Sequence, residues 1–387
     1  MLRTGISGID EMLGGGIPGE SKVLVSMEPG VDGGLFMATT LVDALSRDRT
    51  CLVVIPTSTR DAFREEILST KGVDIHTRPD RIITLDSRTR EDIRKNIRDH
   101  SQRLAEWKRV ICSGCTENNV DVAFIYFDLF YEDFGLDGAL SVLEMTGVDK
   151  KPVVVVEHLN LEGDTFIEDL ASAGLFDLVF SIKASYTGVP FFNFLTVEHI
   201  SWTQLPRRSV PYLISDGTIR LYIPKIIVTG PPASGKTTFV NNASEYGIST
   251  DRNDFRGSST TVAMDLGWVH LKGFDISIYG TPGKPRFDPI LPQLFKCAMG
   301  AVLIIDVTRP ETLDRARQLL TMIQQALLPV VLVANKSDLP YTLGKEEIRR
   351  ILNLPEDTII TFISATRSSD VSCVVEDLVE QIIMFPY

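Results

Sequence analysis

The sequence Lys225-Ile-Ile-Val-Thr-Gly230-Pro-Pro-Ala-Ser-Gly235-Lys236-Thr237-Thr238 decides how the second half of the chain is interpreted. An apolar run that favours a β-strand leads into the spacing Gly-x4-Gly-Lys-Thr, and a stretch with helical periodicity follows. Glycines at this spacing let backbone N–H groups surround phosphates at a helix N-terminus. We therefore predict a nucleoside phosphate site, with Lys236 on the terminal phosphates and the Thr237 hydroxyl on Mg²⁺. The nucleotide contacts expected here are Gly230, Ser234, Gly235, Lys236, Thr237 and Thr238.

The base is indicated further along, where the apolar run Val330–Val333 ends in Ala334-Asn335-Lys336-Ser337-Asp338. A carboxylate at Asp338 can accept hydrogen bonds from N1–H and N2–H₂ of guanine, whereas adenine offers an acceptor at N1. Asn-Lys-x-Asp alone is common, and a polar loop before a helix is the alternative interpretation. Its place after an apolar run, about 100 residues beyond the phosphate loop, favours selectivity for GTP over ATP.

These motifs occur in the order and spacing of the Ras-like small GTPases, and look most like the MglA/Arf-like prokaryotic branch. The resemblance covers Ile223–Tyr387 and implies GTP/GDP and Mg²⁺ as cofactors. By matching position it implies that Thr261, or its neighbour Thr260, ligates Mg²⁺ and that Ala365, next to Ser364, contacts guanine through its backbone. It also implies that Lys336 flanks the base. The segments that carry the resemblance are Gly230–Thr237, Thr260-Thr261, Gly280-Thr-Pro-Gly283, Asn335–Asp338 and Ser364-Ala365-Thr366.

One segment departs from the family pattern Asp-x-x-Gly-Gln, because here it reads Gly280-Thr-Pro-Gly283-Lys284. The acid that holds Mg²⁺ through water and the glutamine that orients the attacking water are both replaced, so we expect Mg²⁺ to lack one outer contact. The Gly283 N–H can still sense the γ-phosphate. Arg286 or Lys284 could stabilise transition-state charge, and a solvated loop is the alternative. The predicted catalytic set is Lys236, Thr261, Gly283 and Arg286, with slow or partner-assisted hydrolysis.

The start of the chain, Thr4-Gly-Ile-Ser-Gly-Ile-Asp10-Glu-Met-Leu-Gly14-Gly-Gly-Ile-Pro18-Gly, resembles the RecA-superfamily ATPases of the KaiC/RadA type. The resemblance continues to about Tyr222. Gly33 stands where that family has its lysine, Gly34 removes the hydroxyl for Mg²⁺, and Asp32 adds charge repulsion toward a triphosphate.

One further departure points the same way. The strand Val122–Asp128 keeps the acid of the family, but the basic finger of the family is replaced by Glu198 and His199. We predict a catalytically inactive scaffold, a pseudo-ATPase. Two alternatives stay open, a weak adenine-nucleotide site at Pro29–Gly34 and a KaiC-like ATPase.

Apolar β-rich runs alternate with amphipathic stretches along the whole chain, which is typical of parallel sheets covered by helices. We therefore expect an α/β fold with two P-loop-type domains, RecA/KaiC-like over residues 1–222 and Ras-like over 223–387. Short strands are predicted at Phe191–Val197, Ser201–Gln204 and Thr218–Tyr222, around turn-prone residues such as Pro211, with a new strand after Pro224. The other predicted strands are Lys22–Ser26, Thr50–Ile55, Val122–Phe127, Pro152–Val156, Lys225–Thr229, Ala301–Ile305 and Val330–Val333.

Composition limits the classes of partner. With 39 Lys and Arg against 51 Asp and Glu, the net charge is −12, which disfavours nucleic acid as a partner. Five scattered cysteines fit a reduced, cytoplasmic setting, and Cys112-Ser-Gly-Cys115 has no second ligand pair to form a zinc site. The sequence has no apolar run of about 18 residues, so we expect no membrane insertion.

The first hypothesis is a GTP-binding regulatory switch whose forms differ at Arg252–Thr261 and Gly280–Pro292, and which regulatory protein partners recognise through these switch loops. The combination of domains suggests an archaeal cytoplasmic regulator. The alternative is a constitutive GTP-bound scaffold without turnover. Whether the N-terminal domain forms a homo-oligomer stays open.

Overall fold

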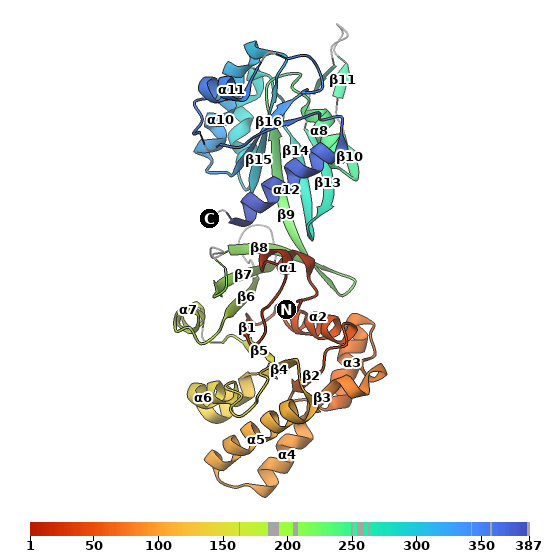
Figure 1. The fold of residues 1–387 in the computed structure, drawn as a ribbon, viewed down its shortest axis with the longest axis vertical. Helices are drawn as coiled ribbons and strands as arrows, with labels where there is room; N and C mark the ends of the chain where they lie inside the picture. Colours follow the sequence, from red (N-terminus) through yellow and green to blue (C-terminus); the bar gives the residue numbers. More distant parts are fainter. Residues whose placement is uncertain are drawn as a thin grey trace. The chain divides into compact units, whose positions relative to one another are not determined.

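The computed structural model describes two compact units, Met1–Leu221 and Tyr222–Tyr387, called unit 1 and unit 2 below (Figure 1). In β10, β11 and β12 only the backbone is described. The described residues are 1–161, 163–184, 193–203, 208–248, 251–253, 259–261, 264–341, 343–356 and 358–384.

Unit 1 contains a parallel sheet with the strand order β6-β1-β5-β4-β2-β3. The predicted apolar strands of this half are confirmed, and they are buried because helices cover both faces. The strands are β1 (Lys22–Met27), β2 (Cys51–Val54), β3 (Ile82–Leu85), β4 (Val122–Tyr126), β5 (Val153–Leu159) and β6 (Leu178–Ala184).

Two groups of helices enclose this sheet. Trp107 of α5, Phe130 of α6 and Ile167 of α7 share one buried cluster with Leu24 and Val156 of the strands. The opposite face carries residues such as Tyr126, whose ring packs edge-on against Phe63 of α3 at 6.4 Å. The helices of unit 1 are α1 (Ser7–Met12), α2 (Gly34–Ser46), α3 (Arg60–Lys71), α4 (Ser87–Asn96), α5 (His100–Asn118), α6 (Asp128–Val142) and α7 (Asp164–Ser172).

Three antiparallel strands follow β6, and here the sequence-based prediction is partly wrong. Residues 201–203 form a bend rather than a strand, and Phe191 and Gln204 lie outside the described residues. The turn-prone Pro211 lies inside a strand, opposite Phe194. These strands are β7 (Asn193–Ile200), β8 (Arg208–Ser215) and β9 (Thr218–Thr229).

β9 runs without a break through Pro224, where a new strand was predicted to begin. Its residues Thr218–Leu221 pair with β8, and its residues Ile226–Thr229 pair with β15. Pro224 lies between the two paired stretches, so its missing N–H removes no hydrogen bond from either of these ladders.

Unit 2 is built on the parallel strands β9, β15, β16 and β17, extended beyond β9 by β14 and the antiparallel β13 and β10. The α/β fold with mainly parallel, helix-covered sheets is therefore confirmed. The strands are β10 (Tyr246–Ile248), β13 (Asp265–Leu271), β14 (Phe274–Gly280), β15 (Gly300–Asp306), β16 (Val330–Asn335) and β17 (Ile360–Ile363), and β11 (Asp251–Asn253) pairs with β12 (Ser259–Thr261) in a separate ladder.

Helices lie on both sides of this sheet as well. α9, α10 and α11 share a buried cluster with Leu303 and Leu332, whereas Gly300 is packed against Ile382 of α12. Because β9, β15, β16 and β17 are parallel, the loops that follow them meet at one edge of the sheet. The helices are α8 (Lys236–Ala243), α9 (Leu291–Phe295), α10 (Leu313–Gln325), α11 (Lys345–Leu352) and α12 (Ser368–Met384).

Candidate nucleotide site

The loop between β9 and α8 has the backbone conformations that its glycines predict. Gly235 has a φ of 99° and precedes Lys236, the first residue of α8. A Cβ on Gly235 would lie 2.2 Å from Nδ2 of Asn335, so only glycine fits there. The Lys236 side chain is buried, and its Nζ donates to the Pro231 carbonyl at 2.8 Å. The loop thus holds a cation and backbone N–H groups at a helix N-terminus.

Asn335 at the end of β16 joins this loop to the segment after β17. Its Nδ2 donates to the Ser234 carbonyl at 2.8 Å, and its Oδ1 accepts from the Ala365 N–H at 2.8 Å. The Ala365 carbonyl in turn accepts from Nδ2 of Asn242 in α8 at 2.6 Å. Three loops that are far apart in sequence are therefore fixed against one another by the side-chain amides of Asn335 and Asn242.

Lys336 bridges two of these loops. Its Nζ donates to the Ala233 carbonyl at 3.0 Å and forms an ion pair with Oδ2 of Asp306 at 2.5 Å. Burial raises the pKa of Asp306, but hydrogen bonds from Lys336 and Thr308 outweigh it and bring this pKa below its ordinary value. Asp306 therefore stays ionised and keeps Lys336 beside the phosphate loop. This ion pair was not predicted.

Asp338 differs from the buried Asn335 because it is exposed. Its carboxylate accepts no hydrogen bond from any residue that the structure describes. Ser364, by contrast, is buried, and its N–H donates to Oδ2 of Asp370 at 3.1 Å. The guanine-reading carboxylate predicted from the sequence is thus available, next to a segment that is already held in place.

Asp265 is the residue that sequence reasoning missed. Its carboxylate is buried at the start of β13, and Oδ2 accepts a hydrogen bond from Oγ1 of Thr237 at 2.7 Å. Asp265 is the register partner of Gly280, and a Cβ on Gly280 would lie 3.1 Å from Oδ2 of Asp265. The Gly280–Lys284 segment has no acid at the position of the family aspartate, but the neighbouring strand places the Asp265 carboxylate in the space that Gly280 leaves.

Gly283 lies directly on the phosphate loop. A Cβ on it would meet the Gly230 carbonyl at 2.7 Å, Nζ of Lys236 at 2.8 Å and N of Pro232 at 2.8 Å. Thr281 anchors the segment, since its N–H donates to the Val228 carbonyl at 2.9 Å. The backbone of Gly283 is thus placed beside the lysine expected on the terminal phosphates.

The remaining predicted residues are less closely gathered. Thr238 and Arg286 are exposed, and the Arg286 guanidinium carbon lies 4.7 Å from the ring centroid of Phe287. Thr261 lies in β12, but its side chain is outside the described residues, as are residues 254–258 of the Arg252–Thr261 segment. The catalytic roles of Arg286 and Thr261 stay predictions.

Unit 1 has a loop at the corresponding place, between β1 and α2, but its contacts are different. A Cβ on Gly33 would lie 2.4 Å from Sδ of Met27, so the buried Met27 side chain fills the space beside the position expected for a lysine. Oε2 of Glu28 accepts from the Ala184 N–H at 3.3 Å. Glu198 likewise has a protein partner, the Ser181 hydroxyl at 2.5 Å. The side chains of Met27, Glu28 and Glu198 thus contact other residues of unit 1.

Carboxyl groups gather near this loop. Burial, together with Asp128, Glu66 and Asp32, raises the pKa of Glu157 to about 8. The residue is only partly buried as a whole, yet its Oε2 atom is fully buried and has no hydrogen-bond partner among the described residues. Negative potential at this place disfavours a triphosphate.

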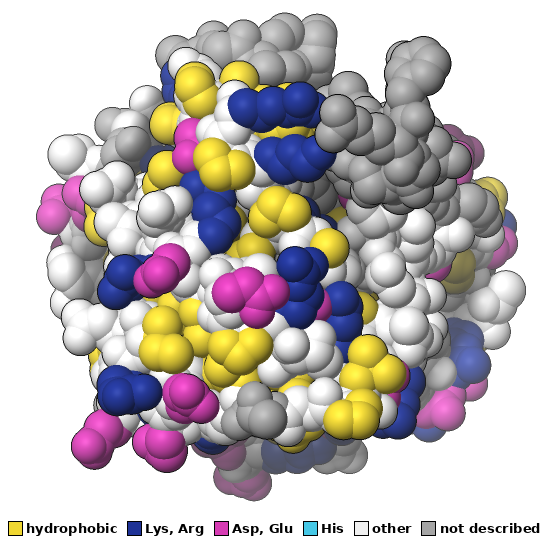
Figure 2. All heavy atoms as spheres, turned by 90° about the horizontal axis from the view of Figure 1, so that it is seen from above, with side chains coloured by type: hydrophobic (Ala, Val, Ile, Leu, Met, Phe, Trp, Pro, Cys, Tyr) yellow, Lys and Arg dark blue, Asp and Glu magenta, His cyan; other side chains and the backbone are white. Residues whose placement is uncertain are grey.

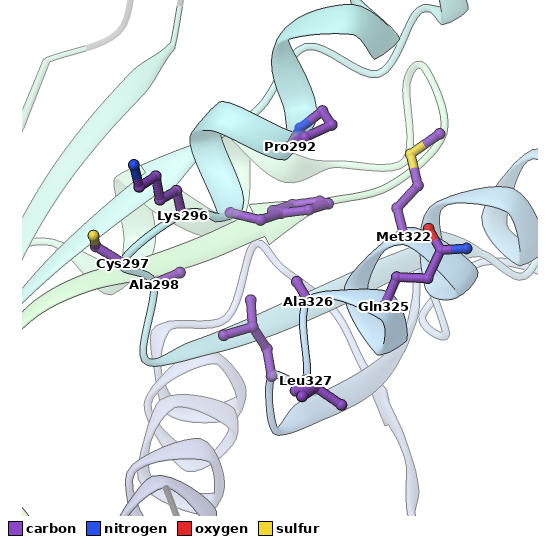
Figure 3. Close-up of a pocket in the computed structure, with 10 residues that line it drawn as sticks. Pro292, Lys296, Cys297, Ala298, Met322, Gln325, Ala326 and Leu327 are labelled. Atoms are coloured by element: carbon purple, nitrogen blue, oxygen red, sulfur yellow. The ribbon is translucent and has the colours of Figure 1, made fainter.

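A cavity of about 590 Å³ in unit 2 lies apart from the nucleotide site (Figure 3). Ala298 and Leu328 line it, and they precede β15 and β16, so the cavity is at the opposite edge of the sheet from the phosphate loop. The other lining residues are Pro292, Phe295, Lys296, Cys297, Met322, Gln325, Ala326 and Leu327. Apart from Pro292, the last residue of the predicted switch segment Gly280–Pro292, no residue of the predicted site is among them.

The surface and the helices add two observations. On the face in Figure 2, Lys and Arg side chains are interspersed with acidic and apolar ones. Within the described ranges, no helix has the length and apolar character needed to cross a membrane, and no three His, Cys, Asp or Glu side chains form a metal-binding group.

Comparison with known proteins identifies the class to which unit 2 belongs. The model of the Ras family matches residues 225–384, so this part of the chain is a Ras-family domain, as the resemblance implies. The Ras-related protein RABA6a of Arabidopsis thaliana is 32% identical over 134 residues, which cover 33% of this chain and 54% of that protein. The Ras-related protein Rab-18 of Caenorhabditis briggsae is 28% identical over 172 residues, 42% of this chain and 81% of that protein.

These matches cover only part of this chain and only part of each relative. The chain spans about half the length of curated relatives such as RABA6a. A solved KaiC-like protein from Pyrococcus horikoshii is 16% identical, with a TM-score of 0.46, over 57% of this chain and 97% of that one.

Proposed function

We propose that the chain is a GTP-binding regulatory switch, with GTP or GDP and Mg²⁺ bound by residues 223–387 and a non-catalytic scaffold in residues 1–222. The observation that carries this proposal is the pair of hydrogen bonds by which Asn335 joins Ser234 to Ala365. They connect the loop suited to phosphates with the two loops suited to guanine. A site for the phosphates and the base of one nucleotide is thereby pre-organised.

Guanine selectivity rests on Asp338 and Ala365. The exposed Asp338 carboxylate can pair with the two donors of guanine, and the buried backbone of Ala365 is held from both sides. Ser364 and Lys336 support this arrangement, because the first orders the segment and the second spans the gap to the phosphate loop. Adenine would leave the carboxylate without a donor.

The residues at the start of α8 fit Mg²⁺. Hydroxyl and carboxylate oxygens are the ligands that this ion prefers, and Thr237 and Asp265 place one of each 2.7 Å apart. The buried Ser234 hydroxyl also has no hydrogen-bond partner among the described residues, as expected beside a phosphate site. We propose that Thr237 binds the ion directly, that Asp265 binds it directly or through water, and that Thr261 joins them. When bound, the ion offsets the negative charge of the phosphates.

For hydrolysis we propose a slow or partner-assisted reaction. Lys236 would stabilise the terminal phosphates, and the Gly283 N–H would meet the γ-phosphate. Lys284 replaces a water-orienting glutamine, and the exposed Arg286 is available to a developing charge only if the segment moves. A regulatory partner that binds Gly280–Pro292 could supply such a movement.

The scaffold role of residues 1–222 is supported by Met27, Glu28 and Glu157. The first covers Gly33, the second is hydrogen-bonded to the backbone of Ala184, and the raised pKa of the third reflects the acidic side chains around it. Together they favour packing within the unit over binding of ATP phosphates.

The test of base selectivity is competition of GTP, GDP and ATP for a fluorescent guanine nucleotide on the full-length protein. GTP and GDP should compete far better than ATP, and Asp338→Asn should reduce the preference by about tenfold or more, since a charge-assisted pair is worth about 1.5–3 kcal/mol. Asp314→Asn, an exposed aspartate on α10, is the matched control. Equal competition by ATP and GTP in the wild type would contradict the proposal.

A further inference from the structure

Arg315 of α10 contacts both ends of the segment that follows Gly280. Its Nε donates to the Gly283 carbonyl at 3.4 Å, and its Nη1 donates to Oδ2 of Asp288 at 2.9 Å. Nη2 donates to the other carboxylate oxygen of Asp288, so the pair is bidentate. The Arg315 side chain is only 11% exposed, although α10 turns several other charged residues toward solvent.

A bidentate pair of this kind fixes direction as well as distance, because the planar guanidinium matches the two carboxylate oxygens. Asp288 lies in the 3₁₀ helix Pro285–Ile290, which is followed directly by α9. α10 itself is anchored in the core through residues such as Leu319. Arg315 therefore connects a helix that is anchored in the core to the segment after Gly280 at two points.

We propose that Arg315 is a positioning residue that holds Gly283 on the phosphate loop in the place where its N–H meets the γ-phosphate. This inference rests on the proposed function of the site. Gly283 already contacts the loop so closely that a Cβ would overlap Gly230, Pro232 and Lys236. Arg315 donates a hydrogen bond to the carbonyl of the same residue. Arg315 thus acts through Gly283 and needs no contact with the nucleotide.

This arrangement has a signature that general stabilisation lacks. GDP has no γ-phosphate, so loss of Arg315 should weaken a GTP analogue and leave GDP nearly unchanged. We expect Arg315→Ala and Asp288→Asn each to weaken GppNHp by about tenfold, with GDP affinity within about twofold. Arg315→Lys keeps the charge but lacks the planar fork, so it should recover only part of the loss. Arg317→Ala, which removes an exposed arginine from the same helix, is the control.

The first readout is displacement of fluorescent GDP from the full-length variants by GDP and by GppNHp in Mg²⁺. A changed ratio of the two affinities in Arg315→Ala and Asp288→Asn, with an unchanged ratio in Arg317→Ala, supports the proposal. Equal loss of both nucleotides, or no loss of either, overturns it. If Arg315→Ala does not fold, Arg315→Lys and Asp288→Asn give the same comparison.

The second readout needs no nucleotide, so it separates this inference from the proposed function. Trypsin can cut the Arg286–Phe287 bond only when the segment detaches, whereas Pro285 protects the bond after Lys284. We expect Arg315→Ala to raise cleavage at Arg286 by about tenfold and Arg317→Ala to leave it unchanged. If the wild type binds no guanine nucleotide, the proposed function fails. The rate of cleavage at Arg286 still tests whether Arg315 holds the segment in place. An unchanged rate in both Arg315→Ala and Asp288→Asn overturns the positioning role.

Discussion

The two units carry comparable loops that differ most clearly at the position of the lysine. In each, a buried parallel strand leads through a glycine-containing loop into a helix, from β1 to α2 in unit 1 and from β9 to α8 in unit 2. Unit 2 has the buried Lys236 at the start of its helix, whereas unit 1 has Gly33 there, beside the side chain of Met27. The phosphate loop of unit 2 therefore contains a buried ammonium group, whereas the thioether of Met27 lies at the corresponding place in unit 1.

This difference separates what the loop contributes to the fold from what it contributes to binding. The strand, the turn and the helix persist in unit 1 without the lysine, because burial of apolar side chains such as Val25 and Leu35 stabilises them. A buried lysine without phosphates costs desolvation, and Lys236 offsets part of that cost with the Pro231 carbonyl. A loop that keeps a buried lysine is suited to an anionic ligand, because the negative charge of the ligand would offset the desolvation of the ammonium group.

The largest expected effect is that of Lys236→Ala. Two charge-assisted hydrogen bonds of about 1.5–3 kcal/mol each predict a loss of roughly 10²–10⁴ in GTP affinity. Competition binding with a fluorescent GTP analogue measures it, and Lys345→Ala, an exposed lysine at the start of α11, is the control. Wild-type affinity in Lys236→Ala would show that the triphosphate does not bind at this loop.

The next effect concerns the carboxylate beside Thr237. Asp265→Asn should weaken the Mg²⁺-dependent part of GTP binding by about tenfold or more, since it removes a charged oxygen ligand. Gly280→Asp should not improve Mg²⁺-dependent GTP binding. The Cβ of the new side chain would lie 3.1 Å from Oδ2 of Asp265, and its carboxylate would add a second negative charge. Mg²⁺ titrations of GTP affinity compare the variants. Tighter Mg²⁺ binding in Gly280→Asp would contradict the role of Asp265.

Restoring the lysine in unit 1 should fail to restore binding. Gly33→Lys would overlap Met27, and such overpacking costs about 1–3 kcal/mol. We expect a lower melting temperature of unit 1 and no ATP-dependent rise in it. Met27→Ala combined with Gly33→Lys should recover part of the stability. An ATP-dependent rise with Gly33→Lys alone would mean that only the lysine is missing.

The smallest expected effect is a pH dependence of unit 1. The pKa of Glu157 is about 8 in the folded protein and near 4.5 in the unfolded chain, so the carboxyl stabilises the fold fully below about pH 4.5. This stabilisation is lost progressively as the pH rises toward 8, because the unfolded chain ionises first. Glu157→Gln should flatten the decline and raise the melting temperature of unit 1 at pH 8.5. A parallel decline in both proteins would exclude Glu157 as its cause.

The sequence predicts well what depends on local spacing. The buried strands, the phosphate loop and the Asn335–Asp338 segment each follow from a short run of residues, and the structure gathers them at one sheet edge. Pro211 and Pro224 mislead, because their places in the strands depend on which neighbours pair with them.

The missed residues depend on contacts between distant segments. Asp265 acts through its register with Gly280, and Arg315 through a helix that packs beside Gly283. A signal for Asp265 exists in the sequence, since the family acid is absent at Gly280 while an unassigned aspartate follows Thr261. The Met27 contact leaves no such signal, because it results from side-chain packing alone.

The most direct test of the central claim is the number and kind of nucleotides that the full-length chain binds in Mg²⁺, measured by isothermal titration with GTP and with ATP. The account predicts one GTP site per chain in the wild type and none in Lys236→Ala. It also predicts no ATP binding in the wild type or in Lys236→Ala. ATP binding that survives Lys236→Ala would place a working nucleotide site in unit 1 and contradict the division of roles between the two loops.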